Sequence, residues 1–447
     1  MRSEQSRTLI WGLIFLCFIF FPGIVSAQEN NNAYTLEKSI AEALDNNWLI
    51  KAKKEKIDES FYVKKQAKAA FLPKLSTSYG FSRLSEVYKT DPIPLGPGAA
   101  IPGQELNSHD NYQWRTTITQ PLFTGFALSS SYELTKLGID LSKIGLELEK
   151  LDLILRVKEA YFNILKADRG LDVGEKAVES LESHVKSARS FYKVGMIPVN
   201  DLLKAEVELA AAQHNFVKAL NATKLARSSF NIVLSRSIND HIEVKDILGF
   251  KPEKSDFSIL LNRAIKTRPE VGELDINLLQ ADQKIRLAKS KYYPEVALTY
   301  DYIKEGDHMD VAGSRFHDAG KWEVGAGLTW TFWEWGKTDN SVNEARSFKR
   351  QLIHIREALV DKIRLEIKRA ILDLEEADKN VPTTKKAMEQ AEENLRVSQE
   401  RFKAQVTTST EVLDAQTLLT QARTNYFTAF YDHYLAAARL QRAIGDY

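Results

Sequence analysis

Cysteine is nearly absent from this sequence of 447 residues, which holds only one, Cys17. An intramolecular disulfide needs two cysteines, so none stabilises the fold. Neither sign of charge dominates, because 61 lysine and arginine residues almost balance 60 aspartate and glutamate residues. The basic surface that nucleic-acid backbones require is therefore missing, and nucleic acid is not an expected partner.

Sequence motifs of enzymes are also missing. No GxxxxGK[ST] phosphate loop, HExxH zinc motif, GxSxG elbow or cysteine pair occurs, so neither nucleotide hydrolysis nor metal chemistry is indicated. We expect a protein that is not an enzyme, needs no cofactor and draws its energy from a partner. His308, Met309, Asp310 and His317 share one predicted loop, but their irregular spacing does not predict a metal site.

Long apolar runs are missing as well. The longest follows Arg2 and Arg7, ends at Phe21 and precedes small residues. Its length of about 13 residues falls short of the roughly 18 or more that a membrane-spanning helix needs. It fits a secretory signal peptide at residues 1–27, with which Cys17 would be removed. We therefore expect an exported chain without a helical membrane anchor.

The rest of the sequence is an internal duplication. Four short matches recur at a constant offset of 210 residues: Ala167-Asp168 with Ala377-Asp378, Phe191-Tyr192-Lys193 with Arg401-Phe402-Lys403, Asp201-Leu202-Leu203 with Glu411-Val412-Leu413, and Asn215-Phe216 with Asn425-Tyr426. A fixed offset indicates two repeats of one plan. We assign the first repeat to 28–234, a linker to 235–256 and the second repeat to 257–447.

Each repeat is predicted to end in a long helical hairpin. Residues 127–194 contain almost no helix breaker, and their leucines and isoleucines recur in steps of three and four, as in a heptad seam. This segment and its counterpart at 339–404 would each extend for roughly 100 Å at 1.5 Å per residue. Shorter helices return beside them, at 201–234 and 411–444, with tips near 195–201 and 405–411.

Two segments of alternating hydrophobicity precede the long helix in each repeat. Trp322, Val324 and Leu328, for example, alternate with polar or small residues, and similar patterns occupy 75–82, 114–119 and 295–302. Strands with one apolar, aromatic-ended face and one small, polar face are typical of outer-membrane barrels. A half-buried sheet outside a membrane alternates equally well, but two isolated hairpins would leave unpaired edges.

These four strands are too few to close a barrel in lipid, since the smallest bacterial barrels use about eight. Several copies of the chain would have to share one barrel, and counting alone allows a dimer, a trimer or a tetramer. External loops are expected at 89–111 and 304–320. The proline-rich part of the first, 91–103, is expected to be a stiff surface crossing rather than a site of chemistry.

Several local features resemble the TolC outer-membrane efflux family. They are the duplication, the Phe71-Leu72-Pro73 corner, the exits Pro121-Leu122-Phe123-Thr124-Gly125 and Phe332-Trp333-Glu334-Trp335-Gly336 into the long helices, and the turn Thr407 to Gln416. The resemblance covers nearly all of the mature chain. It implies a mainly α, internally duplicated fold with coiled-coil hairpins, in which three copies build one twelve-stranded transmembrane barrel and a long helical tunnel.

The resemblance also assigns roles at the periplasmic tip. Glu411 and Asp414 match positions where family members carry acidic rings that constrict the entrance. Their spacing of three residues places both carboxylates on one helix face, and in a trimer they would form two negative rings that concentrate cations. A solvated acidic face is the alternative, because the equivalent positions of the first repeat hold Asp201 and Lys204.

In this family a latch of hydrogen bonds and ion pairs opposes opening of the tip. Asp201 matches one acidic member, but Phe402 stands in place of a hydrogen-bonding tyrosine and Thr407 in place of an arginine. The latch is therefore incomplete in this sequence. The turns that contain Gly195, Asn200 and Thr407 match the region where the family docks a periplasmic adaptor, although Gly195 also suits a tight reversal without that role.

The function implied by the resemblance is an outer-membrane exit channel of a tripartite efflux or type I secretion system. Its partners would be two further copies, outer-membrane lipid, a periplasmic adaptor and an inner-membrane pump or ABC exporter. The tunnel would project into the periplasm of a Gram-negative bacterium. A periplasmic coiled-coil structural or adaptor protein is the alternative, but it gives no reason for four strands with aromatic ends.

Overall fold

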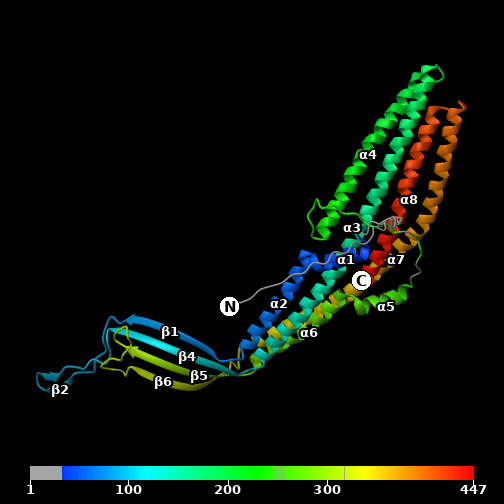
Figure 1. Ribbon diagram of the computed structural model, residues 1–447. Helices are drawn as coiled ribbons and strands as arrows, with labels where there is room; N and C mark the ends of the chain where they lie inside the picture. Colours follow the sequence, from blue (N-terminus) through cyan, green and yellow to red (C-terminus); the bar gives the residue numbers. More distant parts are fainter. Residues whose placement is uncertain (1–32, 248, 253–255, 317, 447) are drawn as a thin grey trace, which may run out of the picture.

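The computed structural model describes residues 33–247, 249–252, 256–316 and 318–446. The molecule is elongated, with a twisted β-sheet at one end and two helical hairpins at the other (Figure 1). Long helices extend from the sheet to the tips of the hairpins. The predicted signal peptide lies outside the described residues.

One antiparallel sheet combines the strands of both repeats. Its strand order is β1-β4-β5-β6, and the pairing of β4 with β5 joins the two hairpins that the sequence predicts as separate. The four predicted strands are confirmed as β1 (Lys74–Arg83), β4 (Asp110–Thr124), β5 (Glu295–Gly306) and β6 (Gly320–Thr329). The last strand ends at Thr329, before Phe332. Strands β1 and β6 therefore form the two edges of the sheet.

The two faces of this sheet differ in chemistry because neighbouring residues on a strand point to opposite sides. One row that crosses all four strands is apolar and exposed, and it consists of Leu75, Ile118, Tyr300 and Val324. The adjacent row lies on the opposite face and is polar, with Ser76, Thr117, Asp301 and Glu323. The predicted alternation is thus present in the paired sheet.

The expected crossing at 91–103 contains two short strands instead. β2 (Ile93–Gly96) pairs antiparallel with β3 (Ala99–Ile101) and forms a small hairpin that projects beyond the main sheet (Figure 1). Gly96 and Gly98 have φ values of 131° and 86°, which glycine adopts far more easily than other residues. The proline-rich composition hid this hairpin, because proline is normally confined to edges and bulges of sheets.

The long helices of the two repeats have equal lengths. α3 and α7 contain 67 residues each, and α4 and α8 contain 35 each, which confirms the predicted hairpins. The helices are α1 (Leu36–Asn46), α2 (Trp48–Ala69), α3 (Ala127–Lys193), α4 (Val199–Val233), α5 (Phe257–Thr267), α6 (Pro269–Lys289), α7 (Lys337–Lys403) and α8 (Ser409–Ala443), with a short 3₁₀ helix η1 (Ser290–Tyr292).

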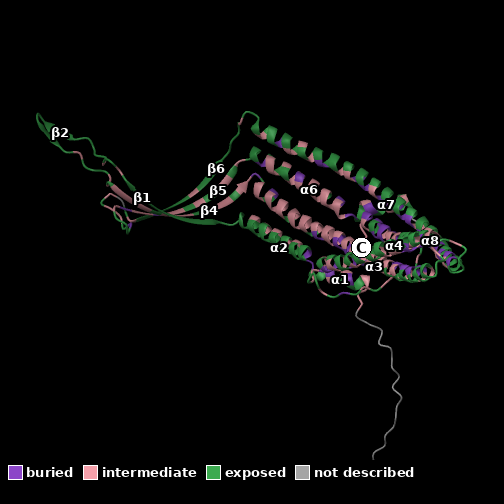
Figure 2. Ribbon diagram, turned by 90° about the horizontal axis from the view of Figure 1, so that it is seen from above, coloured by how far each residue is buried: buried purple, intermediate pink, exposed green. Residues whose placement is uncertain are grey.

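The helices form a curved layer. Near the sheet, α2 packs on α3, α3 on α6 and α6 on α7, so that α2 and α7 lie at the two edges (Figure 2). Towards the tips, α3 packs on α4 and α8, and α8 packs on α7. The edge helices α2 and α7 expose most of their residues (Figure 2), including Phe61 and Leu365. Two opposite flanks of the helical layer, along α2 and α7, are therefore uncovered near the sheet.

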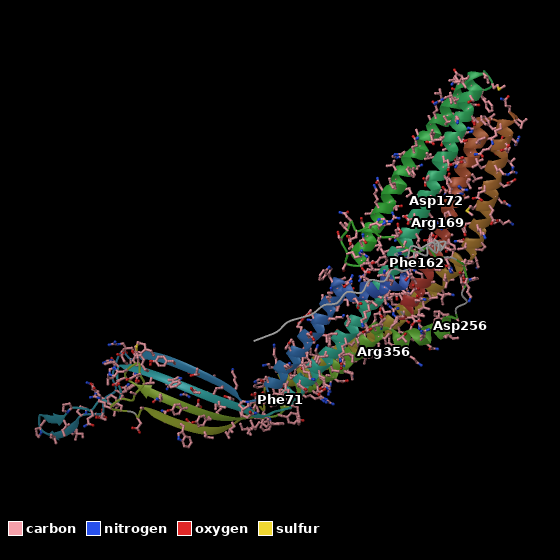
Figure 3. All side chains as sticks on the ribbon, viewed as in Figure 1. Phe71, Phe162, Arg169, Asp172, Asp256 and Arg356 are labelled. Carbon is pink, nitrogen blue, oxygen red and sulfur yellow. The ribbon has the colours of Figure 1, made fainter. Side chains whose placement is uncertain are left out.

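The corner between helix and sheet lies at Phe71, at the junction of the two parts of the molecule (Figure 3). Its ring packs edge-on against Tyr132 of α3 at a centroid distance of 6.2 Å. The side-chain amide of Gln120 donates a hydrogen bond of 2.9 Å to the Phe71 carbonyl. These contacts fix the direction in which β1 leaves the helical layer.

The linker between the repeats is held against the middle of the hairpins. The guanidinium of Arg169, on α3 (Figure 3), binds the carboxylate of Asp246 in the linker. The Tyr431 hydroxyl donates a second bond of 3.0 Å to the same carboxylate. A short bridge between Tyr34 and Val244 ties the linker to the beginning of the described chain.

The helical segment at the start of each repeat is broken at one residue. Asn47 separates α1 from α2, and its side-chain amide donates a 3.0 Å bond to the Val233 carbonyl at the end of α4. Arg268 separates α5 from α6 and donates a 3.4 Å bond to the equivalent Ala443 carbonyl of α8. Both side chains satisfy a carbonyl that a helix end leaves without an intrahelical partner.

Arg268 also anchors a buried ion cluster. Its guanidinium lies 2.8 Å from Glu270 and 2.6 Å from Glu366, and Arg442 lies 2.8 Å from Glu270. Burial alone raises the pKa of Glu270, but the bonds from Arg268 and Arg442 outweigh it and lower the pKa to about 2. Stability from this carboxylate is present above its ordinary pKa of 4.5 and is lost as the pH falls towards 2.

We expect Arg268→Gln to lower the free energy of unfolding by about 2–3 kcal/mol, because it leaves two partly buried carboxylates with too few partners. The matched control is Arg263→Gln, because this exposed arginine pairs with Asp446 at 2.7 Å and surface pairs contribute at most about 1 kcal/mol. Thermal unfolding in detergent measures both. Equal shifts for the two variants would contradict the proposed anchoring role.

Candidate functional site at the tips of the hairpins

Both hairpins reverse through turns with the same backbone geometry. Gly195 and Gln405, at the same place in the two repeats, have φ values of 75° and 62°. In each turn the next N–H closes back on the helix end, from Met196 to the Phe191 carbonyl at 2.9 Å and from Val406 to the Arg401 carbonyl at 3.0 Å. This left-handed closing residue is a common helix stop, for which glycine is the least strained choice.

Glu411 lies in the first turn of α8 and is held within its own hairpin. Its carboxylate lies 3.0 Å from Nη1 of Arg401, in the last turn of α7. The Thr407 hydroxyl, in the turn between the helices, donates to the other carboxylate oxygen. Two of the residues singled out in the sequence, Thr407 and Glu411, are thus brought together, and Arg401 is added to them.

Asp414 lies one turn further along α8 and is exposed. It lines a shallow groove between the beginnings of α4 and α8, together with Asn200 and Lys204. Within the described residues, its carboxylate forms no ion pair or side-chain hydrogen bond. Asp201, in the first turn of α4, likewise has no such partner in the described chain. Gly195 lies apart from these carboxylates, at the end of the first turn.

Phe402 is a packing residue. Its side chain is only 3% exposed and contacts the rings of His184 and Phe191, at centroid distances of 4.8 and 5.5 Å. The surrounding cluster joins α3, α4, α7 and α8 near the tips through residues such as Leu202 and Val412. A phenylalanine therefore suits this position without any hydrogen-bond partner.

A row of buried and partly buried polar contacts crosses between the two hairpins. Nε2 of His184 on α3 lies 2.8 Å from the hydroxyl of Ser409, the first residue of α8. One turn away, Ser180 donates a 2.6 Å bond to the side-chain carbonyl of Gln416. Gln399 of α7 adds a bond of 3.3 Å to Ser180. All the side chains in these contacts are uncharged, and the contacts fix the position of one hairpin relative to the other.

Burial lowers the pKa of His184 from 6.5 to about 4, because the charged imidazolium would lose its hydration there. The imidazole is therefore neutral at pH 7. No signal in the sequence identifies this residue, since its partner lies 225 positions away. Arg401 was also missed, although a basic residue at the end of one helix and an acidic residue after a tight turn are a recognisable pair.

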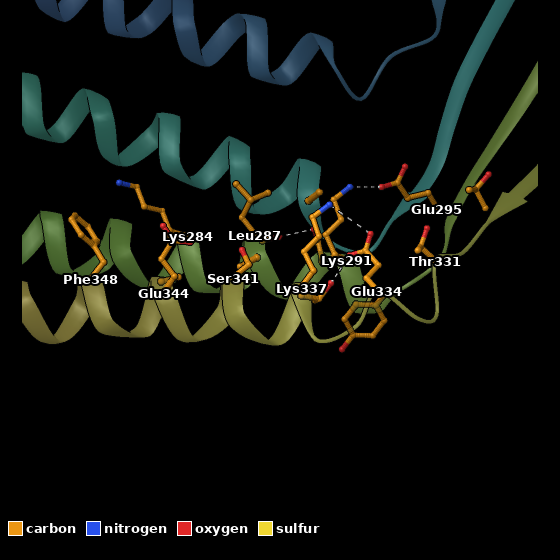
Figure 4. A pocket seen from close by; sticks show the side chains of 17 residues that line it. Lys284, Leu287, Lys291, Glu295, Thr331, Glu334, Lys337, Ser341, Glu344 and Phe348 are labelled. Atoms are coloured by element: carbon orange, nitrogen blue, oxygen red, sulfur yellow. Dashed lines mark hydrogen bonds and ion pairs between the residues drawn. The ribbon is translucent and has the colours of Figure 1, made fainter.

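Polar side chains also gather at two other places in the described chain. A groove where the helices meet the sheet contains Lys291 and Lys337 (Figure 4), which pair with Glu295 at 3.1 Å and Glu334 at 3.9 Å. Its ion pairs are internal, so they do not indicate a ligand. In the loop with His308, no group of three potential metal ligands exists among the residues that the structure describes, and His317 lies outside them.

The tips lie at the end of the molecule furthest from the sheet (Figure 1), as in a channel whose barrel and entrance are separated by a helical tunnel. A family model described as outer membrane efflux protein matches residues 39–230 and 260–446, most of the chain. The chain belongs to the outer membrane efflux protein family. This confirms the resemblance noted in the sequence, and with it the mainly helical, duplicated fold with four strands per chain.

Solved structures of outer-membrane proteins share this fold. The Campylobacter jejuni CmeC outer membrane channel is 18% identical, with a TM-score of 0.77, over 92% of this chain and 85% of that one. The Neisseria gonorrhoeae MtrE outer membrane channel, solved in its open state, is 20% identical, with a TM-score of 0.72, over 92% and 89%. VceC of Vibrio cholerae is 14% identical, with a TM-score of 0.74, over 92% and 96%.

Curated protein sequences give no match to this efflux protein. Among the described helices, none has an apolar stretch long enough to cross a lipid bilayer. The membership and the shared fold rest on matches that span both repeats. They do not assign roles to individual tip residues of this chain.

The neutral state of His184 leads to a prediction for pH. The unfolded chain takes up a proton at this residue near pH 6.5, whereas the folded chain resists it down to about pH 4. Stability is therefore full above pH 6.5 and falls as the pH is lowered, by about 2 kcal/mol at pH 5. We expect His184→Gln, which can keep the bond to Ser409 without titrating, to lose less stability between pH 7 and pH 5.

Thermal unfolding midpoints of both proteins at the two pH values measure this difference. Other titrating groups change equally in the two proteins, so the difference between them isolates His184. Identical pH dependence of the two midpoints would contradict the stabilising role of neutral His184 between the two hairpins.

Proposed function

We propose that this efflux protein is the outer-membrane exit channel of a tripartite efflux or type I secretion system, built from three copies of the chain. The observation that carries the proposal is the sheet with an exposed apolar face and two uncovered edges, β1 and β6. In lipid, each unpaired backbone group at such an edge costs several kcal/mol, about 2–7 by transfer measurements. The edges must therefore pair with other copies.

Three copies are the number that family membership favours, and they would supply about twelve strands, within the range of known barrels. The apolar row of Leu75, Ile118, Tyr300 and Val324 would face lipid, and the polar row of Asp301 and its neighbours would face the lumen. Exposed aromatic residues at the end of β6, Trp330 and Phe332, would lie at the membrane interface, where such rings are favoured.

The helical layer would continue the barrel as a tunnel into the periplasm of a Gram-negative bacterium. The uncovered flanks along α2, α4 and α7 supply the surface through which copies would join. Transport through such a channel is passive, so an inner-membrane pump or ABC exporter would supply the energy. A periplasmic adaptor would connect the two at the turns that contain Gly195, Asn200 and Thr407.

The tips of the hairpins would form the entrance. Glu411 and Asp414 lie one turn apart on α8 and are proposed to line its narrowest part, with Asp201 on the neighbouring hairpin as an acidic gate residue. Phe402 would contribute to the gate by packing the hairpins together rather than by hydrogen bonding. The first two turns of α8 would thus hold the acidic residues of the entrance, and the buried cluster behind them would stabilise the tip.

We expect detergent-purified mature protein to form small, weakly cation-preferring channels in planar bilayers, and Asp414→Asn to remove that preference. The reason is that Asp414 is a solvent-facing carboxylate without a partner in its own chain, so it attracts counterions directly. Single-channel currents under a potassium chloride gradient measure the preference. The control is Glu59→Gln, on α2 far from the tip, which removes one exposed carboxylate paired with Lys56 at 2.7 Å.

Currents that are unchanged by Asp414→Asn would keep the channel and refute the proposed constriction. Absence of current from a folded protein that stays in solution without detergent would refute the channel. That second result would favour a periplasmic coiled-coil adaptor, which has no use for an exposed apolar sheet.

A further inference from the structure

The acidic residues at the tips are not equivalent in the two repeats. Glu411 is bound on one oxygen by Arg401 at 3.0 Å and on the other by the Thr407 hydroxyl. In the first repeat the residues at the equivalent positions are Phe191 and Ile197, which offer neither a charge nor a hydrogen bond. The acidic residue of the first repeat that is equivalent to Glu411, Asp201, has no side-chain partner in the described chain. The clamp on Glu411 is therefore a feature of the second hairpin alone.

A paired carboxylate acts on ions differently from a free one. The field of an ion pair falls off much faster with distance than that of a single charge, and salt screens what remains within about 8 Å at physiological ionic strength. Arginine keeps its proton at every accessible pH. As long as Arg401 stays in place, Glu411 adds little net negative charge to the space in front of the tip.

We infer that Arg401 sets the charge of the channel entrance by clamping Glu411 within its own hairpin. The layer of the entrance formed by Glu411 is then close to neutral, and only the Asp414 layer keeps its negative charge, with Lys204 in the same groove. Such an entrance suits uncharged or zwitterionic organic cargo better than metal cations. This inference rests on the proposed channel function.

Side-chain exposure makes the clamp testable without loss of the fold. Arg401 and Glu411 are 50% and 44% exposed, so the pair contributes little to stability, and its removal leaves the tip packed. Lys403 provides a matched control, since it lies two residues away, is similarly exposed at 62% and binds Glu400 at 3.0 Å. Substitution of either residue by glutamine removes one positive charge near the turn.

The experiment compares reversal potentials of single channels under a potassium chloride gradient for the wild type, Arg401→Gln, Lys403→Gln, and Arg401→Gln combined with Glu411→Gln. We expect Arg401→Gln to raise the permeability ratio of potassium to chloride by about threefold or more, because it frees one carboxylate in each copy at the narrowest level. The double variant should return to the wild-type ratio. Lys403→Gln should change it little.

Equal effects of Arg401→Gln and Lys403→Gln would overturn the inference, because they would reflect general surface charge. A ratio that Arg401→Gln leaves unchanged would overturn it as well. If Arg401→Gln raised the ratio and the double variant kept it raised, Glu411 would not be the residue that Arg401 neutralises. Absence of current from the wild type would refute the channel itself, an outcome distinct from all of these.

Discussion

Unpaired backbone groups at the edges of the sheet are the constraint on which the rest of this structure depends. Among the described strands, none pairs with the outer N–H and C=O groups of β1 or β6, and the face between these edges is apolar and exposed. Water can hydrogen-bond to the unpaired groups at the edges, and lipid can cover the apolar face, but neither environment suits both features. A closed barrel made from several copies satisfies both, because it pairs every edge and places the apolar face against lipid.

The helices extend the same duplicated arrangement away from the sheet. Each strand hairpin continues into a pair of helices, and the duplication gives the two halves equal helices of 67 and 35 residues. Asn47 and Arg268 hold the breaks in the layer through bonds to equivalent carbonyls. At the far end, the turns keep one backbone geometry while their side chains diverge, so only the second hairpin clamps its acid. Architecture is thus shared between the repeats, and the chemistry of the tip is not.

Periodicity made most of the fold predictable. The long heptad seams and the strict alternation around Trp322 and Leu75 gave the hairpins and strands within a few residues, because both patterns follow from a single local geometry. The pairing of β4 with β5 and the small β2–β3 hairpin were missed, since the first depends on contacts between repeats and the second lies in a proline-rich segment.

The sequence predicted where the hairpins turn, but not the side-chain contacts at the tips. Spacing put Glu411 and Asp414 on one helix face, and both residues lie on α8. The clamp by Arg401 depends on how side chains meet across a turn. The buried contact of His184 with Ser409 joins two residues that are 225 positions apart in the sequence. Neither arrangement is encoded in a local pattern.

Cross-linking of the sheet edges tests the central claim most directly. The only cysteine, Cys17, lies in the predicted signal, so cysteines can be introduced singly at Ser76, Ser78 or Gly80 of β1 and combined with Gly327→Cys of β6. Within one chain the two edges are about 14 Å apart, across two intervening strands, and these β1 positions lie still further from Gly327 along the strand direction, too far for a disulfide. Oxidation in membranes should give a covalent trimer for at least one pair and none for single cysteines. Monomers alone from every pair, or a covalent dimer or tetramer, would contradict the account.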